Sequence, residues 1–289
     1  MRSKFLYLIL LLAVLIVPDG RLAKASNSKI NVVGSTTVLP IASRAAEEFV
    51  RLKGGAVTIT VNPGGSGVGV NSVGTGRADI GMVSRELSAQ EIKKFQAADL
   101  QVHGVGLDRV VCAVSAEIYQ AGVHVLSKQN IRDIYLGKIT HWNQVGGPHR
   151  KIVVVDKERH RGTRQVFMDF IFGDPAARAP AARLVTGSNN EEQTKIAQSD
   201  AAIGMLSSAW MNRDVRGVAI EDQGITYDSA KMSEYPIVRR LNLVTRGEPH
   251  GLVKEFIQFI QGPAGHKIVQ QSGYSLIDST KRNGYAASH

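Results

Sequence analysis

The fold can first be recognised in residues 31–50, NVVGSTTVLPIASRAAEEFV. A short apolar run, which predicts a strand, is followed by three hydroxyl residues and then by a predicted helix. The apolar residues on one side of that helix are Ile41, Ala45, Phe49 and Leu52. Two interpretations of Ser35, Thr36 and Thr37 are open: they cap the helix, or they hold an anion at the unpaired N–H groups of its first turn.

The same alternation continues along the chain. Segments rich in β-branched residues predict strands at 30–33, 56–62 and 78–84, separated by helices. This order predicts parallel strands with crossover helices. A second unit of the same kind follows, with strands predicted at 107–115, 150–156 and 201–206 and helices at 128–137, 162–172 and 189–199. An extended segment, 235–247, and a helix, 252–262, end the pattern.

We therefore predict an α/β protein of two lobes with a ligand cleft between them, since open α/β folds bind ligands at the carboxyl ends of their strands. The predicted first lobe comprises residues 29–107 and 233–289, and the second comprises 108–232. Residues 1–25 have the three regions of a secretory signal peptide: Arg2 and Lys4, an apolar run, and the triplet Ala23-Lys24-Ala25. The apolar run is too short for a comfortable membrane span, so we expect cleavage after Ala25 and a periplasmic protein.

Charge and cysteine content restrict the function classes. The formal net charge is +10, and it is +7 without residues 1–25, which favours anionic partners without identifying them. Nucleic acid is disfavoured because the basic residues are not interleaved with aromatic ones. The single cysteine, Cys112, lies in an apolar stretch and is expected to be a buried core residue, with no disulfide and no cysteine-based metal site.

The glycine-rich loop at 62–70, NPGGSGVGV, lacks the endings of nucleotide-binding loops. Its Ser66 either belongs to an ordinary turn or adds a hydroxyl to an anion site. Asp79 begins the next strand. As an acceptor-only carboxylate it could bond the proton of hydrogen phosphate and reject sulfate. The alternative is an ion pair of Asp79 with Arg77 or Arg85.

The second unit contains DKERHRGTRQVF, residues 156–167, with cations around a Gly162-Thr163 turn into a helix. Such an arrangement is suited to an oxyanion. Some of the four cations, Lys157, Arg159, Arg161 and Arg164, must be simply solvated, and we favour Arg161 and Thr163 as ligand contacts.

Catalytic interpretations are weaker. The histidines show no metal-binding spacing. There is no Gly-x-Ser-x-Gly motif, and Ser66 has no identifiable base. We expect His141 and Trp142 to pack or cap a turn.

Several motifs, in this order, resemble the phosphate-binding substrate proteins of bacterial ABC importers: GSTTVLP, GGSGVG, RADIGMVSRE, LDRVVCAVS, IRDIYLGKITHWNQVGGP, GTRQVF and YPIVRRLNLVTRG. The resemblance covers essentially the whole chain after the leader. It implies a type II periplasmic binding fold that closes on its ligand by a hinge.

By motif position, the resemblance implies phosphate contacts from both lobes. The first lobe would supply Ser35, Thr36, Thr37, Ser66, Asp79 and Ser84, and the second Gly162 and Thr163. In place of the family's Arg-x-x-x-Ser-Gly-Thr pattern this chain has Lys157 and Arg161, and Arg161 could supply the guanidinium fork that a lysine lacks.

We predict a non-enzymatic protein, without cofactor or metal, that captures inorganic phosphate for the permease subunits of an ABC importer, and we expect a monomer. Alternatives are a binding protein for sulfate or molybdate, a secreted phosphatase in which Ser66 or Thr163 attacks an ester, and a sensor or adhesion role on the same scaffold.

Overall fold

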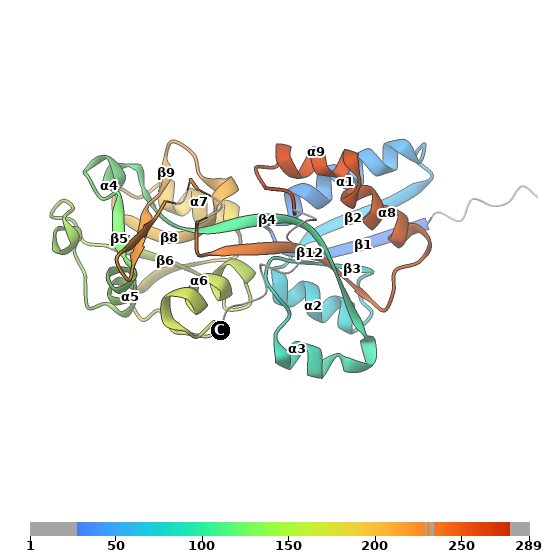
Figure 1. Cartoon of the computed structure of the whole chain (residues 1–289), viewed down its shortest axis with the longest axis horizontal. Coiled ribbons are helices and arrows are strands. Elements are labelled where there is room, and N and C mark those ends of the chain that lie inside the picture. Colours follow the sequence, from blue (N-terminus) through green and yellow to red (C-terminus); the bar gives the residue numbers. More distant parts are fainter. Residues whose placement is uncertain (1–27, 229, 232–233, 278–289) are drawn as a thin grey trace, which may run out of the picture.

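A computed structural model describes residues 28–228, 230–231 and 234–277. Two α/β lobes lie side by side, and two long strands, β4 (Leu100–Ser115) and β12 (Val238–Arg246), run between them (Figure 1). The two strands pair antiparallel over most of their length. The predicted two-lobe α/β architecture is therefore confirmed, while the predicted signal peptide lies outside the described residues.

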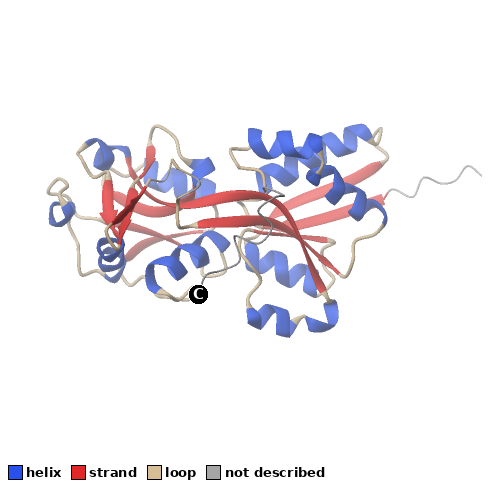
Figure 2. Ribbon diagram, viewed as in Figure 1, coloured by secondary structure: helices blue, strands red, loops and turns tan. Residues whose placement is uncertain are grey.

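The first lobe is built on the strand order β2-β1-β3-β12-β4. β1 pairs in parallel with both β2 and β3, as the predicted crossovers require. Helices α1, α8 and α9 cover one face of this sheet, and α2 and α3 cover the other (Figures 1 and 2). The elements are β1 (Ser28–Gly34), α1 (Leu39–Leu52), β2 (Val57–Pro63), α2 (Ser66–Gly74), β3 (Ile80–Val83), α3 (Ala89–Lys94), α8 (Gly251–Gln261) and α9 (Pro263–Gln271).

In the second lobe the far half of β4 continues the sheet through β8, β6 and β7, and β9 also pairs with β4. A small separate sheet has the order β11-β10-β5. The elements are α4 (Ala116–Gln120), β5 (Val125–Ser127), α5 (Lys128–Leu136), β6 (Val153–Lys157), α6 (Gly162–Phe172), β7 (Ala182–Thr186), α7 (Asn189–Ala197), β8 (Ala202–Ser207), β9 (Val215–Gly217), β10 (Ala219–Asp222) and β11 (Ile225–Tyr227).

Each lobe has its own hydrophobic core. Phe49, in α1, and Phe256, in α8, pack edge to face in the first. The second core contains Trp142, whose Nε1 donates to the Ala201 carbonyl at 2.9 Å. Tyr235 also belongs to this second core. The residue boundaries of the lobes stay a prediction.

Some details differ from the sequence prediction. The lobes share one nine-stranded sheet through β4 and β12, a pairing that the sequence analysis did not predict. β4 begins seven residues before the predicted strand, at Leu100, because Gly104 and Gly106 obscure its pattern. Gly106 has a packing role, since an added Cβ would lie 3.1 Å from Val269 of α9. Leu52 is 59% exposed at the end of α1, whereas Cys112 is buried as predicted.

Candidate functional site

The hydroxyl residues after β1 meet those at the end of β3. The Ser35 N–H donates to the Met82 carbonyl at 2.8 Å, which fixes the turn after β1 beside β3. The Ser35 hydroxyl then donates to Ser84 Oγ at 2.9 Å, and Ser66 Oγ lies 3.3 Å from Ser84 Oγ. The Ser84 N–H also donates to Ser66 Oγ, at 3.1 Å. Three serines from separate segments of the first lobe are thus held together, and all three are buried.

Threonine side chains extend this group into the second lobe. Thr37 Oγ1 lies 3.4 Å from Thr163 Oγ1, and Asn189 Nδ2 donates to Thr37 Oγ1 at 2.9 Å. Both threonine side chains are buried. Ser35, Thr37, Ser66, Ser84 and Thr163 are called the hydroxyl cluster below.

The helix α1 begins at Leu39, and Val38, the residue before it, provides no side-chain cap. Ser35 Oγ accepts from the Thr37 N–H at 3.2 Å. Thr36, predicted as a contact with its two neighbours, is half-buried in the same turn but takes no part in the bonds of the cluster. The Ser35 carbonyl also accepts from the Leu39 N–H at 3.0 Å, so Ser35 has the geometry of a cap for the turn that leads into α1, and the two interpretations left open by the sequence do not exclude each other.

The start of α6 lies directly against the cluster. A Cβ added at Gly162 would clash with Ser66 Oγ and lie 2.7 Å from Ser84 Oγ, so the main chain of the second lobe approaches as closely as glycine allows. α6 has no side-chain cap. The N–H groups of its first turn therefore have no intrahelical partner, and the positive end of its dipole faces this region.

A guanidinium that sequence analysis did not assign completes the site. Arg239 Nη2 donates to Thr37 Oγ1 at 3.2 Å and to Thr163 Oγ1 at 3.0 Å, bridging the two lobes. Its Nε and Nη2 bond Asp108 Oδ2 at 3.0 and 2.7 Å, and Ser207 donates to Asp108 Oδ1 at 2.8 Å. Arg239 and Asp108 are opposite each other on β12 and β4.

The Arg239 side chain is only 3% exposed, yet its Nη1 has no hydrogen-bond partner among the residues that the structure describes. A buried donor of this kind is costly unless it is satisfied. An anion within hydrogen-bond distance of Nη1 would satisfy it. The sequence did hold a signal for this residue, because Ile237, Arg239 and Leu241 occupy alternate positions of an extended segment and all three are buried. A cation at a core-facing strand position needs a partner, and Asp108 is the partner.

The two cations predicted from the second lobe are engaged elsewhere. Lys157 Nζ lies 2.5 Å from Glu192 Oε2 and donates to the Ser188 carbonyl at 3.2 Å, with both side chains buried. Burial lowers the pKa of Lys157 and raises the pKa of Glu192, and their mutual attraction opposes both shifts. Arg161 is paired with Glu158, with Nε at 2.7 Å from Oε2.

Asp79 lies away from the cluster. It is exposed, and its Oδ2 accepts from the Asn31 N–H at 2.8 Å rather than from Arg77 or Arg85. The reason is geometric. The cluster lies at the carboxyl end of β3, where Ser84 follows the strand, whereas Asp79 precedes the same four-residue strand and is separated from Ser84 by about 17 Å of extended chain. The proton-reading role predicted for Asp79 has no support in this arrangement.

The bonded neighbours of the candidate nucleophiles do not favour catalysis. Within the described ranges, Ser66 and Thr163 bond hydroxyls, a main-chain N–H and a guanidinium, and no carboxylate or imidazole. No group of three or more His, Cys, Asp or Glu side chains suited to a metal ion occurs in this part of the chain. Among the same residues, no helix has the length and apolar character to cross a membrane.

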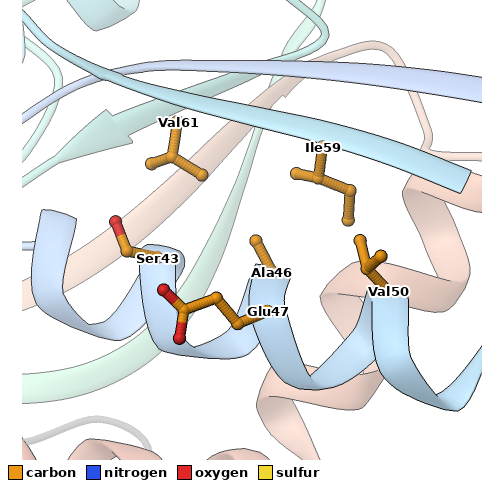
Figure 3. Close-up of a pocket in the computed structure, with 6 residues that line it drawn as sticks. All are labelled: Ser43, Ala46, Glu47, Val50, Ile59 and Val61. Atoms are coloured by element: carbon orange, nitrogen blue, oxygen red, sulfur yellow. The ribbon is translucent and has the colours of Figure 1, made fainter. Parts of the chain in front are cut away.

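A surface pocket lies elsewhere, between α1 and β2 of the first lobe (Figure 3). It shares no residue with the cluster, and most of its lining is aliphatic. The lining residues are Ser43, Ala46, Glu47, Val50, Ile59 and Val61.

Known proteins resemble this chain over most of its length. Residues 22–264 match the family described as PBP superfamily domain. The phosphate-binding protein PstS of Bacillus subtilis is 31% identical over 261 residues, which cover 89% of this chain and 83% of that protein. PstS of Borreliella burgdorferi is 27% identical, covering 86% of this chain and 90% of the relative.

Solved structures agree as well. The ABC-type phosphate transport receptor of Vibrio cholerae superposes with a TM-score of 0.68 at 28% identity, covering 86% of this chain and all of that one. A Clostridium perfringens protein crystallised with bound phosphate gives a TM-score of 0.77 at 26% identity, covering 87% of this chain and 100% of the other.

Proposed function

The chain belongs to the family of the phosphate-binding proteins of ABC importers, and from that premise we propose that it captures inorganic phosphate in the cleft between its lobes. The observation that carries the proposal is the convergence of five buried hydroxyls and one buried guanidinium from both lobes and from the strands between them. The relatives are named as binding proteins, which supports a role in which the ligand is bound and released unchanged.

The ligand contacts of this proposal are the hydroxyl cluster, Arg239 and the first turn of α6. Hydroxyls rotate about their C–O bonds, so each can donate to a phosphate oxygen in place of its present partner. The N–H groups at Gly162 and Thr163 add donors whose direction is fixed by the helix. Arg239 contributes a charge-assisted bond through Nη1.

Lys157 and Arg161 have a supporting place in the proposal. Both are cations near the cluster, and both are bonded to a carboxylate. Lys157 ties β6 to the start of α7 through Glu192 and the Ser188 carbonyl, and Arg161 holds the turn before α6 through Glu158. Neither offers the ligand a free fork. Thr36 stays in the proposed site through its main chain, in the turn after β1. Asp79 is not among the proposed ligand contacts.

Delivery follows from the family. We propose that the protein works outside the cytoplasm, exported by the signal peptide predicted at residues 1–25, and passes phosphate to the membrane permease of an ABC importer. Closure of the two lobes around the anion would exclude water and present the loaded form to the permease. We expect it to act as a monomer.

Isothermal calorimetry with inorganic phosphate tests the binding step. Thr163→Val keeps the shape of the side chain and removes the hydroxyl, so we expect phosphate affinity to fall at least about tenfold. Thr194→Val is the matched control, because the Thr194 hydroxyl is exposed on α7 and bonds only the Asn190 carbonyl.

Absence of phosphate binding by the wild-type protein would refute the proposal. Equal affinities for wild type and Thr163→Val would remove the cluster as the site. Phosphate uptake in a strain lacking the gene tests delivery separately.

A further inference from the structure

The glycine-rich loop that leads into α2 is held firmly by the first lobe. The N–H groups of Gly64 and Gly65 both donate to the Gly34 carbonyl at 2.8 Å, which fixes the loop against the end of β1. Gly65 has a φ of 91°, a conformation that side chains other than glycine rarely adopt. Apart from Ser66, this loop contributes no side chain to the hydroxyl cluster, so its glycines call for an explanation of their own.

The turn before α6, in the second lobe, lies directly on this loop. The Gly67 N–H donates to the His160 carbonyl at 3.1 Å, and His160 Nε2 lies 3.1 Å from the Gly64 carbonyl oxygen. Because a carbonyl oxygen only accepts, His160 Nε2 carries a proton and is the donor of the second bond. His160 therefore joins the two lobes through both its main chain and its side chain, without using a hydroxyl of the cluster.

The glycines of the loop provide the space into which this turn fits. A Cβ added at Gly67 would lie 3.2 Å from His160 Cβ. A Cβ added at Gly65, which is buried, would lie 2.8 Å from Arg161 Cδ and 3.0 Å from His160 Cδ2. Larger residues at these two positions would keep the turn from lying where it does.

The turn is shaped by its own lobe before it meets the loop. The Arg161 N–H donates to the Glu158 carbonyl at 3.0 Å, and Arg161 Nε donates to Glu158 Oε2 at 2.7 Å. Glu158 Oε2 also lies 3.4 Å from His160 Nε2. Two ordered surfaces thus meet, and their contact costs little further conformational entropy.

We propose that residues 64–67 form a seat on which the second lobe closes, and that His160 is a positioning residue for phosphate capture. The inference rests on the proposed function, since closure matters for a ligand held between the lobes. The seat is made only when the lobes are together, so it favours the form that binds phosphate, and the apparent affinity follows the population of that form. Release requires the seat to break, so its bonds act mainly on the rate of dissociation.

The experiment compares His160→Ala and His160→Gln with the wild-type mature protein. Calorimetry with inorganic phosphate gives the affinity, and stopped-flow measurement gives the rate of phosphate release. We expect His160→Ala to raise the dissociation constant about three- to tenfold through faster release, because one hydrogen bond of the closed form is lost. Glutamine keeps an N–H donor, so His160→Gln should stay within about twofold of the wild type. His266→Ala, exposed on α9, is the matched control and should change neither quantity.

Gly67→Ala tests the seat from the side of the first lobe. Its methyl group meets His160 Cβ and removes no bonding group. We expect phosphate affinity to fall about tenfold, since a shift of a few tenths of an ångström is smaller than the shift of about 1 Å that costs 100-fold. Resistance to urea should not fall, because alanine is the better helix former in α2. Combined with His160→Ala, the loss should be smaller than the product of the two single losses, because both changes act on one contact.

The outcomes separate the seat from the proposed function. Phosphate binding with unchanged affinity in both His160→Ala and Gly67→Ala overturns the seat and leaves the proposed function standing. A loss confined to His160→Ala, or an equal loss in His160→Gln, also overturns it, since His160 would then act on the ligand or on the fold of its own lobe. If the wild type does not bind phosphate, the proposed function fails and this inference fails with it.

Discussion

The strand β12 and the turn before α6 each place an arginine beside the hydroxyl cluster, and the two arginines differ in their surroundings. Arg239, on β12, is bonded to the fully buried Asp108 and keeps one buried donor free. Arg161 is paired with Glu158, whose side chain is 42% exposed. Only Arg239 bonds hydroxyls of both lobes.

If the proposed site is right, a cation near a ligand site need not bind the ligand. Whether such a cation can bind the ligand depends on how many of its N–H donors have no partner within the protein, and on how exposed the cation is to water. An ion pair close to solvent contributes little to the stability of the protein, and its side chains rearrange easily. A buried ion pair holds both side chains in place.

The largest effect in the comparison of the two arginines is expected for Arg239→Met. It leaves Asp108 buried without its partner, so we expect the free energy of unfolding in urea to fall by about 3–5 kcal/mol. Arg239→Met with Asp108→Asn removes both charges and should recover part of that loss. Arg246→Lys, at the exposed end of the same strand, is the matched control. A loss below about 1 kcal/mol for Arg239→Met would contradict the assigned ion pair.

Gly162→Ala addresses the turn before α6. Its methyl group would meet Ser66 Oγ and Ser84 Oγ, so the second lobe could not approach the cluster as it does here. We expect phosphate affinity to fall by about 100-fold, because a displacement of about 1 Å is costly at an organised site. Calorimetry measures the affinity, and small-angle scattering measures closure. Unchanged affinity would show that this approach is unimportant.

Arg161→Met should have a much smaller effect than Arg239→Met. The pair with Glu158 is partly exposed, and we expect a change of less than about 1 kcal/mol in the free energy of unfolding. Phosphate affinity should fall by less than about tenfold, through loss of long-range attraction. A larger loss of affinity than that caused by Arg239→Met would reverse the roles given to the two arginines.

The smallest expected effect is a pH dependence of stability, and it concerns the ends of β4 and β12 in the first lobe. His103, on β4, lies with Nε2 2.9 Å from Thr245 Oγ1, and burial lowers the pKa of His103 although Glu248 opposes the shift. Folding therefore favours neutral His103. This contribution to stability is complete above the ordinary histidine pKa of about 6.5 and is lost as the pH falls through and below it.

Thermal unfolding between neutral and mildly acidic pH checks this. His103→Gln should flatten the decline of the melting temperature on acidification, relative to wild type. His266→Gln, on the exposed side of α9, is the control and should leave the slope unchanged. An equal decline in all three proteins would exclude His103 as its source.

Much of the fold was accessible from sequence, because each strand, turn and helix is specified by neighbouring residues. Ser35, Thr37, Ser66 and Thr163 could be placed at the ends of predicted strands, and parallel pairing brings such ends together. The start of β4 and the strands β5, β7 and β9 to β11 were missed, since their residues carry no clear alternation. Their conformation depends on tertiary contacts, which override local propensity.

The site was predictable only where it is local. The pairing of Asp108 with Arg239 joins residues 131 positions apart in the chain, and it follows from the register of two strands, which no local pattern specifies. Asp79 shows the opposite error. It is close to Ser84 in the chain, but the intervening strand β3 carries the two residues to opposite ends of the sheet.

The position of the Asp108 and Arg239 pair also bears on how a bound anion would leave. Both residues belong to the strands about which the lobes would rotate, where a rigid-body rotation displaces atoms least. The charged contact would therefore outlast the contacts with Thr37 and Thr163, which separate as the lobes part. Release would proceed in two stages, with the anion first retained by the strands of the open protein and only then lost to solvent or to a permease.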